Sequence, residues 1–526
     1  MKNTLQHMGT ISRMRLPAAS VALAVAAALL LAAMATQSAE AQITTLASFD
    51  GTNGANPQAP LVQATNGYLY GTTLNGGTST FGTDGTIFKI TPSGTLTSVY
   101  SFCLQSGCPD GYILPAGLVQ ATNGYLYGTT EDGGGNGCCG TVFSITPSGT
   151  LKTLDGLALE DGSGPYPTAG LVQASNGYLY GTTVGGGVFG AGTVFRMTPS
   201  GALTTIFSFC PLPAPTCSST DSIANGWMPA AGLIQATNGE LYGTTLGGGI
   251  NPGGGAYGPG TVFKITPSGV LTTLYSFCSK SNSQNSCLDG YNPVATLVQA
   301  TNGYFYGTTT GGGANNAGTI FRMTPAGTLT TLYSFCSESA CADGTQGAGA
   351  APALIQATDG NLYGTAPYGG ATGGGTSSIG FGTVFKMTPS GELTTLYTFC
   401  ISIGCEDGGR PFGGLVQDTN GTLYGTTSIG GTNSPGYGTV FSLSVALGPF
   451  VKTLPTAALA LAAVKILGSD LTGATAVSFN GTAASFTVVS STEIATTVPA
   501  GATSGVVKVE TPSGTLSSSV KFLVLP

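Results

Sequence analysis

Hydrophobic and polar residues alternate in short runs that recur along most of the chain. In the first complete copy, residues 61–65 (Leu-Val-Gln-Ala-Thr) and residues 68–73 (Tyr-Leu-Tyr-Gly-Thr-Thr) flank Asn66-Gly67. Asn-Gly is the strongest short hairpin signal, because a type I′ turn needs positive φ at both central residues. The pattern therefore predicts two antiparallel strands, a and b, joined by a tight turn.

Two further strands complete the unit. A glycine-rich segment at residues 75–85 predicts a loop, and residues 85–90 (Gly-Thr-Ile-Phe-Lys-Ile) predict strand c. Residues 92–94 (Pro-Ser-Gly) suit a turn, since proline fits its first central position and glycine its left-handed exit. Residues 95–102 are rich in Thr, Val and Tyr, which favour β-structure. Each unit is thus predicted to be a four-stranded antiparallel meander, a to d.

The unit occurs seven times, at intervals of 53–64 residues between its Leu/Phe-Tyr-Gly-Thr cores. A four-stranded sheet repeated seven times predicts an all-β fold, a seven-bladed β-propeller, with an open β-solenoid as the alternative. The cores begin at Leu69, Leu126, Leu179, Leu241, Phe305, Leu362 and Leu423.

The repeat also predicts how the ring closes. Residues 43–50 resemble strand d of a later unit, residues 271–277, although they precede the first strand a. We expect this early strand to pair with strand c of the last unit, residues 438–443, because it would cover an otherwise exposed strand edge. Residues 450–454 are the alternative closing strand.

The repeat ends near Leu454, and the pattern changes. Short strand-like runs follow, separated by turns at Asn480-Gly481, residues 499–501 and residues 512–514. This pattern over about seventy residues predicts a small Ig-like β-sandwich. The expected domains are a propeller at residues 42–454 and the sandwich at residues 455–526.

Both parts resemble known families. The seven LVQATNGxLYGTT…GTVFKITPSG units resemble the GloVer tandem repeat of the choice-of-anchor secreted bacterial proteins over residues 43–454. The tail, with Leu471-Thr-Gly-Ala-Thr475 and Val498-Pro-Ala-Gly501, resembles an IPT/TIG domain. The resemblance implies export and surface placement, but it brings no catalytic residues. Family members often end in a sorting anchor, and we expect that anchor here to be absent or replaced by the IPT/TIG-like domain.

The N-terminal segment has the features of an export signal. Lys2, Arg13 and Arg15 precede an apolar run at residues 16–33, and Ala39-Glu40-Ala41 is a small-x-small cleavage site. Residues 1–41 are therefore predicted to be a secretory signal peptide, with an uncleaved membrane anchor as the alternative. Because no second apolar run of this length exists, we expect no membrane span in the mature, secreted or surface-exposed chain.

Charge and histidine content exclude several functions. Cleavage would remove three of the 15 basic and one of the 22 acidic residues, leaving 12 and 21 and a net charge of −9. An acidic, charge-poor surface argues against nucleic acid as a partner. The only histidine, His7, would also leave, which removes histidine-based catalysis and histidine-ligated metals. We expect no cofactor, no metal and no catalytic residue.

The twelve cysteines lie in neighbouring pairs, which in an exported chain predicts disulfides. Each pair is expected to close an insertion between strand d and the next strand a. Cys138-Cys139 is the exception, and these adjacent residues could form a vicinal disulfide, pair elsewhere or stay free. The predicted disulfides are Cys103–Cys108, Cys210–Cys217, Cys278–Cys287, Cys336–Cys341 and Cys400–Cys405.

The meander places both long connections, b–c and d–a, on one face of the ring. Variable loops on a rigid scaffold usually carry binding. Aromatic side chains there could stack on sugar rings or anchor a protein, or they could simply cap the blade ends. The candidate ligand-binding residues are Tyr112, Tyr166, Trp227, Tyr291, Arg410 and Phe412.

Two repeated polar positions have a structural and a functional interpretation. The d–a loops carry an Asp or Asn before Gly, which could form a cation ring, although the symmetry favours a turn role. The glutamine of each strand a could line a channel or, as we favour, satisfy backbone groups between blades. The loop residues are Asp50, Asp110, Asp161, Asn225, Asp289, Asp343 and Asp407, and the glutamines are Gln63, Gln120, Gln173, Gln235, Gln299, Gln356 and Gln417.

Three functions are compatible with these features. The favoured one is a non-enzymatic propeller that binds a glycan or a surface protein through its loops. The second is a carbohydrate-active enzyme that uses paired carboxylates. The third is a structural envelope component. The carboxylate pairs are Glu131/Asp132, Glu160/Asp161 and Glu406/Asp407.

Overall fold

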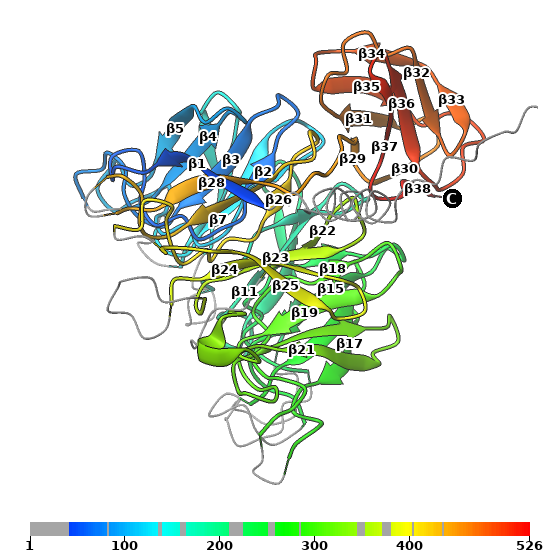
Figure 1. The fold of residues 1–526 in the computed structure, drawn as a ribbon. Coiled ribbons are helices and arrows are strands. Elements are labelled where there is room, and N and C mark those ends of the chain that lie inside the picture. Colours follow the sequence, from blue (N-terminus) through cyan, green and yellow to red (C-terminus); the bar gives the residue numbers. More distant parts are fainter. Residues whose placement is uncertain are drawn as a thin grey trace, which may run out of the picture. The chain divides into compact units, whose positions relative to one another are not determined.

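The computed structural model describes residues 41–81, 84–134, 139–157, 165–209, 225–250, 258–282, 286–344, 353–370, 380–401, 404–433 and 436–525. The predicted signal peptide therefore lies outside the described residues, except for Ala41. The described residues form an all-β structure of seven four-stranded antiparallel sheets followed by a β-sandwich, as expected (Figure 1).

Six blades follow the chain in the order a-b-c-d. Blade 1 consists of β2 (Val62–Gln63), β3 (Leu69–Thr73), β4 (Thr86–Ile90) and β5 (Leu96–Ser101). Blade 2 consists of β6 (Val119–Gln120), β7 (Leu126–Thr130), β8 (Thr141–Ile145) and β9 (Leu151–Gly156). Blade 3 consists of β10 (Val172–Gln173), β11 (Leu179–Thr183), β12 (Thr193–Met197) and β13 (Leu203–Ser208). Blade 4 consists of β14 (Ile234–Gln235), β15 (Leu241–Thr245), β16 (Thr261–Ile265) and β17 (Leu271–Ser276). Blade 5 consists of β18 (Val298–Gln299), β19 (Phe305–Thr309), β20 (Thr319–Met323) and β21 (Leu329–Ser334). Blade 6 consists of β22 (Leu354–Gln356), β23 (Leu362–Ala366), β24 (Thr383–Met387) and β25 (Leu393–Thr398). A short 3₁₀ helix, η2 (Ser339–Cys341), lies between blades 5 and 6.

The seventh blade closes the ring with the N-terminal strand. Its order is β26 (Val416–Gln417), β27 (Leu423–Thr427), β28 (Thr439–Ser444) and β1 (Gln42–Ser48), with Ile43 opposite Leu443. The predicted closure by the early strand d is confirmed. The alternative strand, β29 (Lys452–Leu454), pairs instead with β31 (Ala463–Leu467).

The C-terminal sandwich has two four-stranded sheets, β29-β31-β35-β34 and β33-β32-β36-β37, and a parallel pair β30-β38. Its core includes Val464, Ile466, Phe479, Ile494 and Phe522. The remaining strands are β30 (Ala457–Leu459), β32 (Ala476–Phe479), β33 (Thr482–Ala484), β34 (Phe486–Val488), β35 (Glu493–Thr497), β36 (Val507–Thr511), β37 (Gly514–Ser517) and β38 (Leu523–Leu525).

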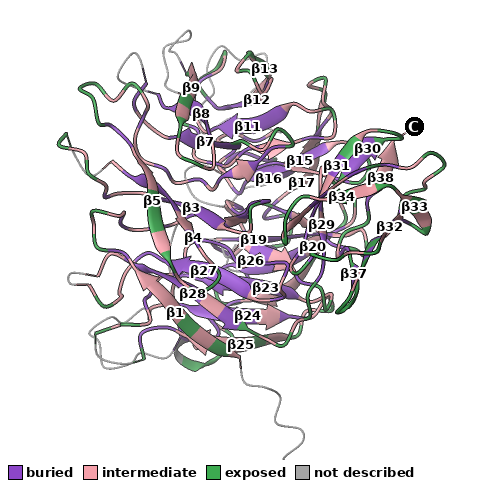
Figure 2. Ribbon diagram, turned by 90° about the horizontal axis from the view of Figure 1, so that it is seen from above, coloured by how far each residue is buried: buried purple, intermediate pink, exposed green. Residues whose placement is uncertain are grey.

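One contact explains why the Tyr-Gly-Thr and Gly-Thr-Val-Phe motifs recur together. In blade 4, a Cβ added to Gly243 of strand b would lie 2.7 Å from Cζ of Phe263 in strand c and 2.7 Å from Cδ2 of Leu233. Only glycine leaves room for the phenylalanine ring, which is fully buried. Strands b are accordingly the most buried and strands d the most exposed (Figure 2). The same pairs are Gly71–Phe88, Gly128–Phe143, Gly181–Phe195, Gly307–Phe321, Gly364–Phe385 and Gly425–Phe441.

A ring of glutamines joins neighbouring blades. The backbone N–H of Thr65 in blade 1 donates to Oε1 of Gln120 in blade 2, and the pattern continues until the N–H of Thr419 in blade 7 donates to Oε1 of Gln63. All seven bonds measure 2.8–3.2 Å. The glutamines therefore satisfy backbone groups between blades, as favoured. Strand a is shorter than predicted, because in blade 1 it ends at Gln63 and the N–H of Thr65 bonds to the next blade.

Two threonines tie strand b to strand c, and blade 6 is the exception. In blade 4, Oγ1 of Thr245 and Oγ1 of Thr261 share a buried hydrogen bond of 2.8 Å. In blade 6, alanine occupies the first position, as Ala366, and Oγ1 of Thr383 is buried without a hydrogen-bond partner among the described residues. A buried hydroxyl without a hydrogen-bond partner lowers the free energy of unfolding, so this position destabilises blade 6. The equivalent bond is present in blades 1, 2, 3, 5 and 7.

The substitution Ala366→Thr is expected to stabilise the protein. It supplies the missing partner for Thr383 and should raise the free energy of unfolding by about 1 kcal/mol. The matched reverse change, Thr245→Ala, removes the 2.8 Å hydrogen bond between the two hydroxyls of blade 4 and should lower the free energy of unfolding by about 1–3 kcal/mol. Denaturant unfolding of both variants measures the two effects. An Ala366→Thr variant no more stable than the parent would contradict this interpretation.

Candidate functional site

The long connections meet on one face of the ring, which we call the loop face; it consists of the b–c and d–a loops. Backbone bridges join five of the d–a loops to the b–c loop of the following blade, for example Tyr112 to Asp132 and Trp227 to Gly247. The tight a–b and c–d turns form the opposite face, the turn face. Further bridges are Ala55–Asn75, Tyr291–Gly311 and Gly409–Ile429.

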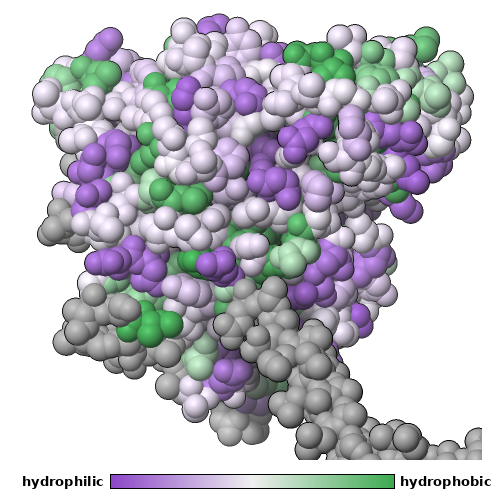
Figure 3. All heavy atoms as spheres, turned by 45° about the horizontal axis from the view of Figure 1, so that its top comes forward, coloured by the Kyte–Doolittle hydropathy of each residue, from purple (hydrophilic) through white to green (hydrophobic). Residues whose placement is uncertain are grey.

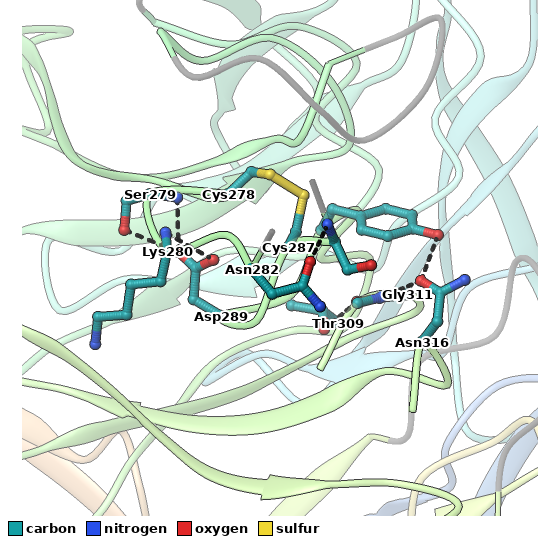
Figure 4. Close-up of a disulfide and its surroundings, with 12 residues drawn as sticks. Cys278, Ser279, Lys280, Asn282, Cys287, Asp289, Thr309, Gly311 and Asn316 are labelled. Atoms are coloured by element: carbon teal, nitrogen blue, oxygen red, sulfur yellow. Dashed lines mark hydrogen bonds between the residues drawn. A yellow bond between two sulfur atoms is a disulfide. The ribbon is translucent and has the colours of Figure 1, made fainter. Parts of the chain in front are cut away.

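Disulfides fix the d–a loops. Figure 4 shows one of them, Cys278–Cys287. The carbonyl oxygen of Cys287 also accepts a 2.9 Å hydrogen bond from the N–H of Gly313 in the next b–c loop. The disulfide therefore holds two loops together. Cys139 is disulfide-bonded, whereas Cys138 and the predicted pair Cys210–Cys217 lie outside the described residues. The predicted pairs Cys103–Cys108, Cys278–Cys287, Cys336–Cys341 and Cys400–Cys405 are all formed.

The repeated loop aspartates hold their own loops. Asp289 is fully buried and accepts a hydrogen bond from the hydroxyl of Tyr275 at 2.6 Å. It also accepts one from the N–H of Ser279 at 2.9 Å (Figure 4). Burial and, to a lesser extent, the carboxylate of Asp289 raise the pKa of the Tyr275 hydroxyl. Where Asn225 replaces aspartate, the preceding strand carries Phe207 in place of tyrosine. The same tyrosine-to-aspartate hydrogen bond joins Tyr100 to Asp110, Tyr333 to Asp343 and Tyr397 to Asp407. Asp161 lies outside the described residues.

The turn interpretation of these aspartates therefore has direct support. Asp50, whose strand carries no tyrosine, accepts hydrogen bonds from Thr52 and from the N–H of Asn53. Within the described ranges, no three His, Cys, Asp or Glu side chains gather as a metal site would require. The same ranges contain no helix long and apolar enough to cross a membrane.

Three of the predicted aromatic residues occupy one equivalent position. Tyr112, Trp227 and Tyr291 are each the d–a residue that bridges to the next b–c loop, one per blade. All three are partly buried. Trp227 packs on a core cluster that includes Tyr180, and the hydroxyl of Tyr291 donates to Oδ1 of Asn316 at 3.3 Å. The three side chains are thus spread around the loop face rather than gathered at one point.

The other predicted residues lie nearby. Tyr166 and Arg410 take the next position along the loop, with left-handed φ values of 42° and 54°. Tyr166 is exposed. The guanidinium of Arg410 lies 5.7 Å from the ring centre of Tyr368, and that ring packs edge-on to Phe412 at 5.8 Å. Arg410 and Phe412 are therefore brought together through Tyr368.

Sequence reasoning missed most of the exposed apolar side chains of the loop face. Among the described propeller residues, eight large exposed hydrophobic side chains lie on the loop face and two on the turn face, so the loop face is the more apolar. Their only sequence signal is an apolar residue within a glycine-rich loop. On the face drawn in Figure 3, apolar side chains stand in small groups among polar ones. The eight residues are Phe81, Leu104, Tyr166, Val188, Phe189, Ile250, Leu288 and Ile401, and the two are Tyr125 and Val270.

A second site missed from the sequence lies on the turn face at blades 1 and 7, where the C-terminal domain is bound. Oγ1 of Thr492 donates to the carbonyl of Thr65 at 2.8 Å. The ammonium of Lys452 donates to the carbonyl of Gln417 and, at 3.2 Å, to Oε1 of Gln63. Its only sequence signal is a single lysine in the apolar stretch of residues 450–454, which is the alternative closing strand.

Comparison with known proteins identifies both parts of the chain. A family model described as the Gloeobacter/Verrucomicrobia repeat matches residues 33–249, 214–404 and 253–485, and the IPT/TIG domain model matches residues 455–524. No curated protein matches the chain.

Two of the solved structures that resemble the chain share little sequence with it. A fungal alcohol oxidase of the AA5 family, in complex with copper, is 12% identical with a TM-score of 0.49, and the match covers 92% of this chain and 99% of that one. The α-L-arabinanase of Penicillium chrysogenum, complexed with arabinobiose, is 10% identical with a TM-score of 0.39, over 77% and 99% of the two chains. Since the repeat model alone spans far more than half of the sequence, the protein belongs to the Gloeobacter/Verrucomicrobia repeat family, and its residues 455–524 form an IPT/TIG domain.

Proposed function

We propose that the protein is an exported, non-enzymatic binding protein that recognises a surface protein through its loop face. The observation that supports this most is the concentration of exposed apolar side chains on that face. Apolar side chains exposed on loops lower the free energy when a partner covers them, and such patches often mark interaction sites.

Hydrogen bonds and a disulfide also hold the part of the loop face around Phe81 and Leu104. The hydroxyl of Ser79 accepts a hydrogen bond from the N–H of Phe81 and donates one to the carbonyl of Cys103. These bonds tie the exposed Phe81 to the loop that carries Leu104. The disulfide Cys103–Cys108 closes that second loop. Rigid loops lose less conformational entropy on binding, which favours affinity.

Export is supported by the disulfides. Three of the four described disulfides span five residues and one spans nine, and all lie in loops of the same kind. Such bonds persist in oxidising compartments and are rare in reducing ones. Together with the apolar N-terminal segment, they favour a secreted or cell-surface location.

A glycan is the second candidate ligand. Tyr112, Trp227 and Tyr291 recur at one position in separate blades, and aromatic rings of this kind stack on sugars. Their partial burial makes them a weaker basis than the more exposed aliphatic side chains.

The enzymatic alternative has less support. Asp407, of the pair Glu406/Asp407, is committed to the hydroxyl of Tyr397 and the N–H of Cys400. The pair Glu160/Asp161 lies outside the described residues. Burial and, to a lesser extent, the charge of Asp132 raise the pKa of Glu131. A carboxyl with a raised pKa suits the role of a general acid, so the enzymatic alternative rests on Glu131.

A pair of surface variants tests the proposed binding. We expect the combined loop-face change Phe81→Ser, Leu104→Ser, Val188→Ser and Ile250→Ser to weaken retention on the producing cells at least tenfold, on the order of 1.4 kcal/mol. The matched turn-face change, Tyr125→Ser with Val270→Ser, should leave retention unchanged. Cell-binding assays with purified protein measure both.

The same assay separates the two ligand classes. Protease treatment of the cells should abolish binding, whereas periodate oxidation of sugars should not. The reverse pattern would favour the glycan. Equal retention of the parent and the loop-face variant would exclude both.

A further inference from the structure

A cavity of about 340 Å³ lies between the propeller and the C-terminal domain. The propeller contributes inner-strand residues of blades 1, 6 and 7, among them Leu61, Ile355 and Leu415. The C-terminal side contributes Phe450 and Val520. This volume falls within the range of small-molecule sites in proteins.

Half of the lining residues are apolar, and one is charged. Seven of the fourteen lining residues are aliphatic or aromatic, and Lys452 is the only charged one. The remaining six are Gln, Thr or Ser residues. A sugar or nucleotide would still leave polar groups unpaired against the apolar half of the wall, which is costly. A ligand with a hydrocarbon body meets no such penalty.

Lys452 supplies the polar end of the site. An ammonium has three N–H donors, and the two bonds to Gln417 and Gln63 leave one for a ligand. Burial lowers the pKa of Lys452 to about 8, and Asp418 acts in the opposite direction, so the side chain is charged at neutral pH. Asp418 is almost fully buried and is not part of the lining. No negative side chain lines the cavity to repel an anion.

We propose that this cavity binds a small anionic amphiphile, such as a medium-chain carboxylate, with its hydrocarbon body against Leu61, Leu415 and Phe450 and its carboxylate on Lys452. Because the walls come from both domains, the ligand would also strengthen the attachment of the C-terminal domain to the turn face. The site is separate from the loop face and does not depend on the function proposed for that face.

The test is calorimetric titration of the chain beginning at Gln42 with decanoate and with its neutral analogue decanol. The parent protein should bind one decanoate per chain. The substitution Lys452→Met should weaken decanoate binding at least about tenfold and leave decanol binding unchanged. Lys465→Met, at a partly buried lysine of the same domain that pairs with Glu493 at 3.1 Å, should change neither.

A second variant guards against misfolding of the first. Val520 lines the cavity but is 54% exposed, so Val520→Trp should fold while it blocks the site and abolishes binding of both compounds. The absence of one-to-one decanoate binding by the parent would overturn the proposal. So would unchanged decanoate affinity in both Lys452→Met and Val520→Trp.

Discussion

A chain that begins at Phe49, and so lacks β1, is expected to lose cooperative unfolding or at least about 5 kcal/mol of stability, the size of a typical domain's whole margin. β1 is the fourth strand of the seventh sheet, and it pairs with β28 from Gln42 to Ser48. Without it, the edge of β28 is exposed and can pair with other chains. Leu46 and Ala47 also pack against the core between blades 7 and 1.

Denaturant unfolding and size-exclusion chromatography of chains that begin at Gln42 and at Phe49 measure this effect. A synthetic peptide of residues 42–49 should restore part of the stability by occupying the empty edge. If both chains unfold at the same denaturant concentration, the ring is not closed by this strand.

The substitution Phe263→Ala should lower the free energy of unfolding by about 3–5 kcal/mol, the usual cost of removing a buried phenylalanine ring. The ring is fully buried, fills the space left by Gly243 and contacts Phe209 at 5.4 Å between ring centres. Gly243→Val should be similarly damaging, because its side chain would enter the space of the ring.

The matched control is Val270→Ala in the same blade. Val270 is 65% exposed, so its truncation should change stability by no more than about 0.5 kcal/mol. Denaturant unfolding of the three variants measures these changes in the free energy of unfolding. A Phe263→Ala protein within 1 kcal/mol of the parent would show that the repeated glycine–phenylalanine contact does not hold the blades together.

The fold could be predicted from the sequence because its determinants are local and repeated. Asn-Gly turns, alternating strands and an N-terminal copy of strand d define the blades and their closure. The interblade role of residues such as Gln120 also followed, since seven equivalent side chains in a symmetric ring have equivalent partners.

The functional surfaces could be predicted only in outline. Chain topology places the long loops on one face, but the exposure of Ile250 or Leu104 depends on how each glycine-rich loop folds, which has no periodic signal. The cavity at Lys452 requires residues more than 350 positions apart, so no local pattern reports it. The cluster of Arg410, Tyr368 and Phe412 likewise joins two different loops.

The central claim is that the loop face, and not the turn face, recognises a partner. Blade 4 offers a matched pair of positions for its test, since Ile250 on the loop face is 63% exposed and Val270 on the turn face is 65% exposed. Photoreactive p-benzoylphenylalanine is placed at one position or the other, and the protein is irradiated on the cells that produce it. Mass spectrometry should find crosslinked partners from position 250 and none from position 270. Crosslinks from position 270 alone, or equally from both, would contradict the claim.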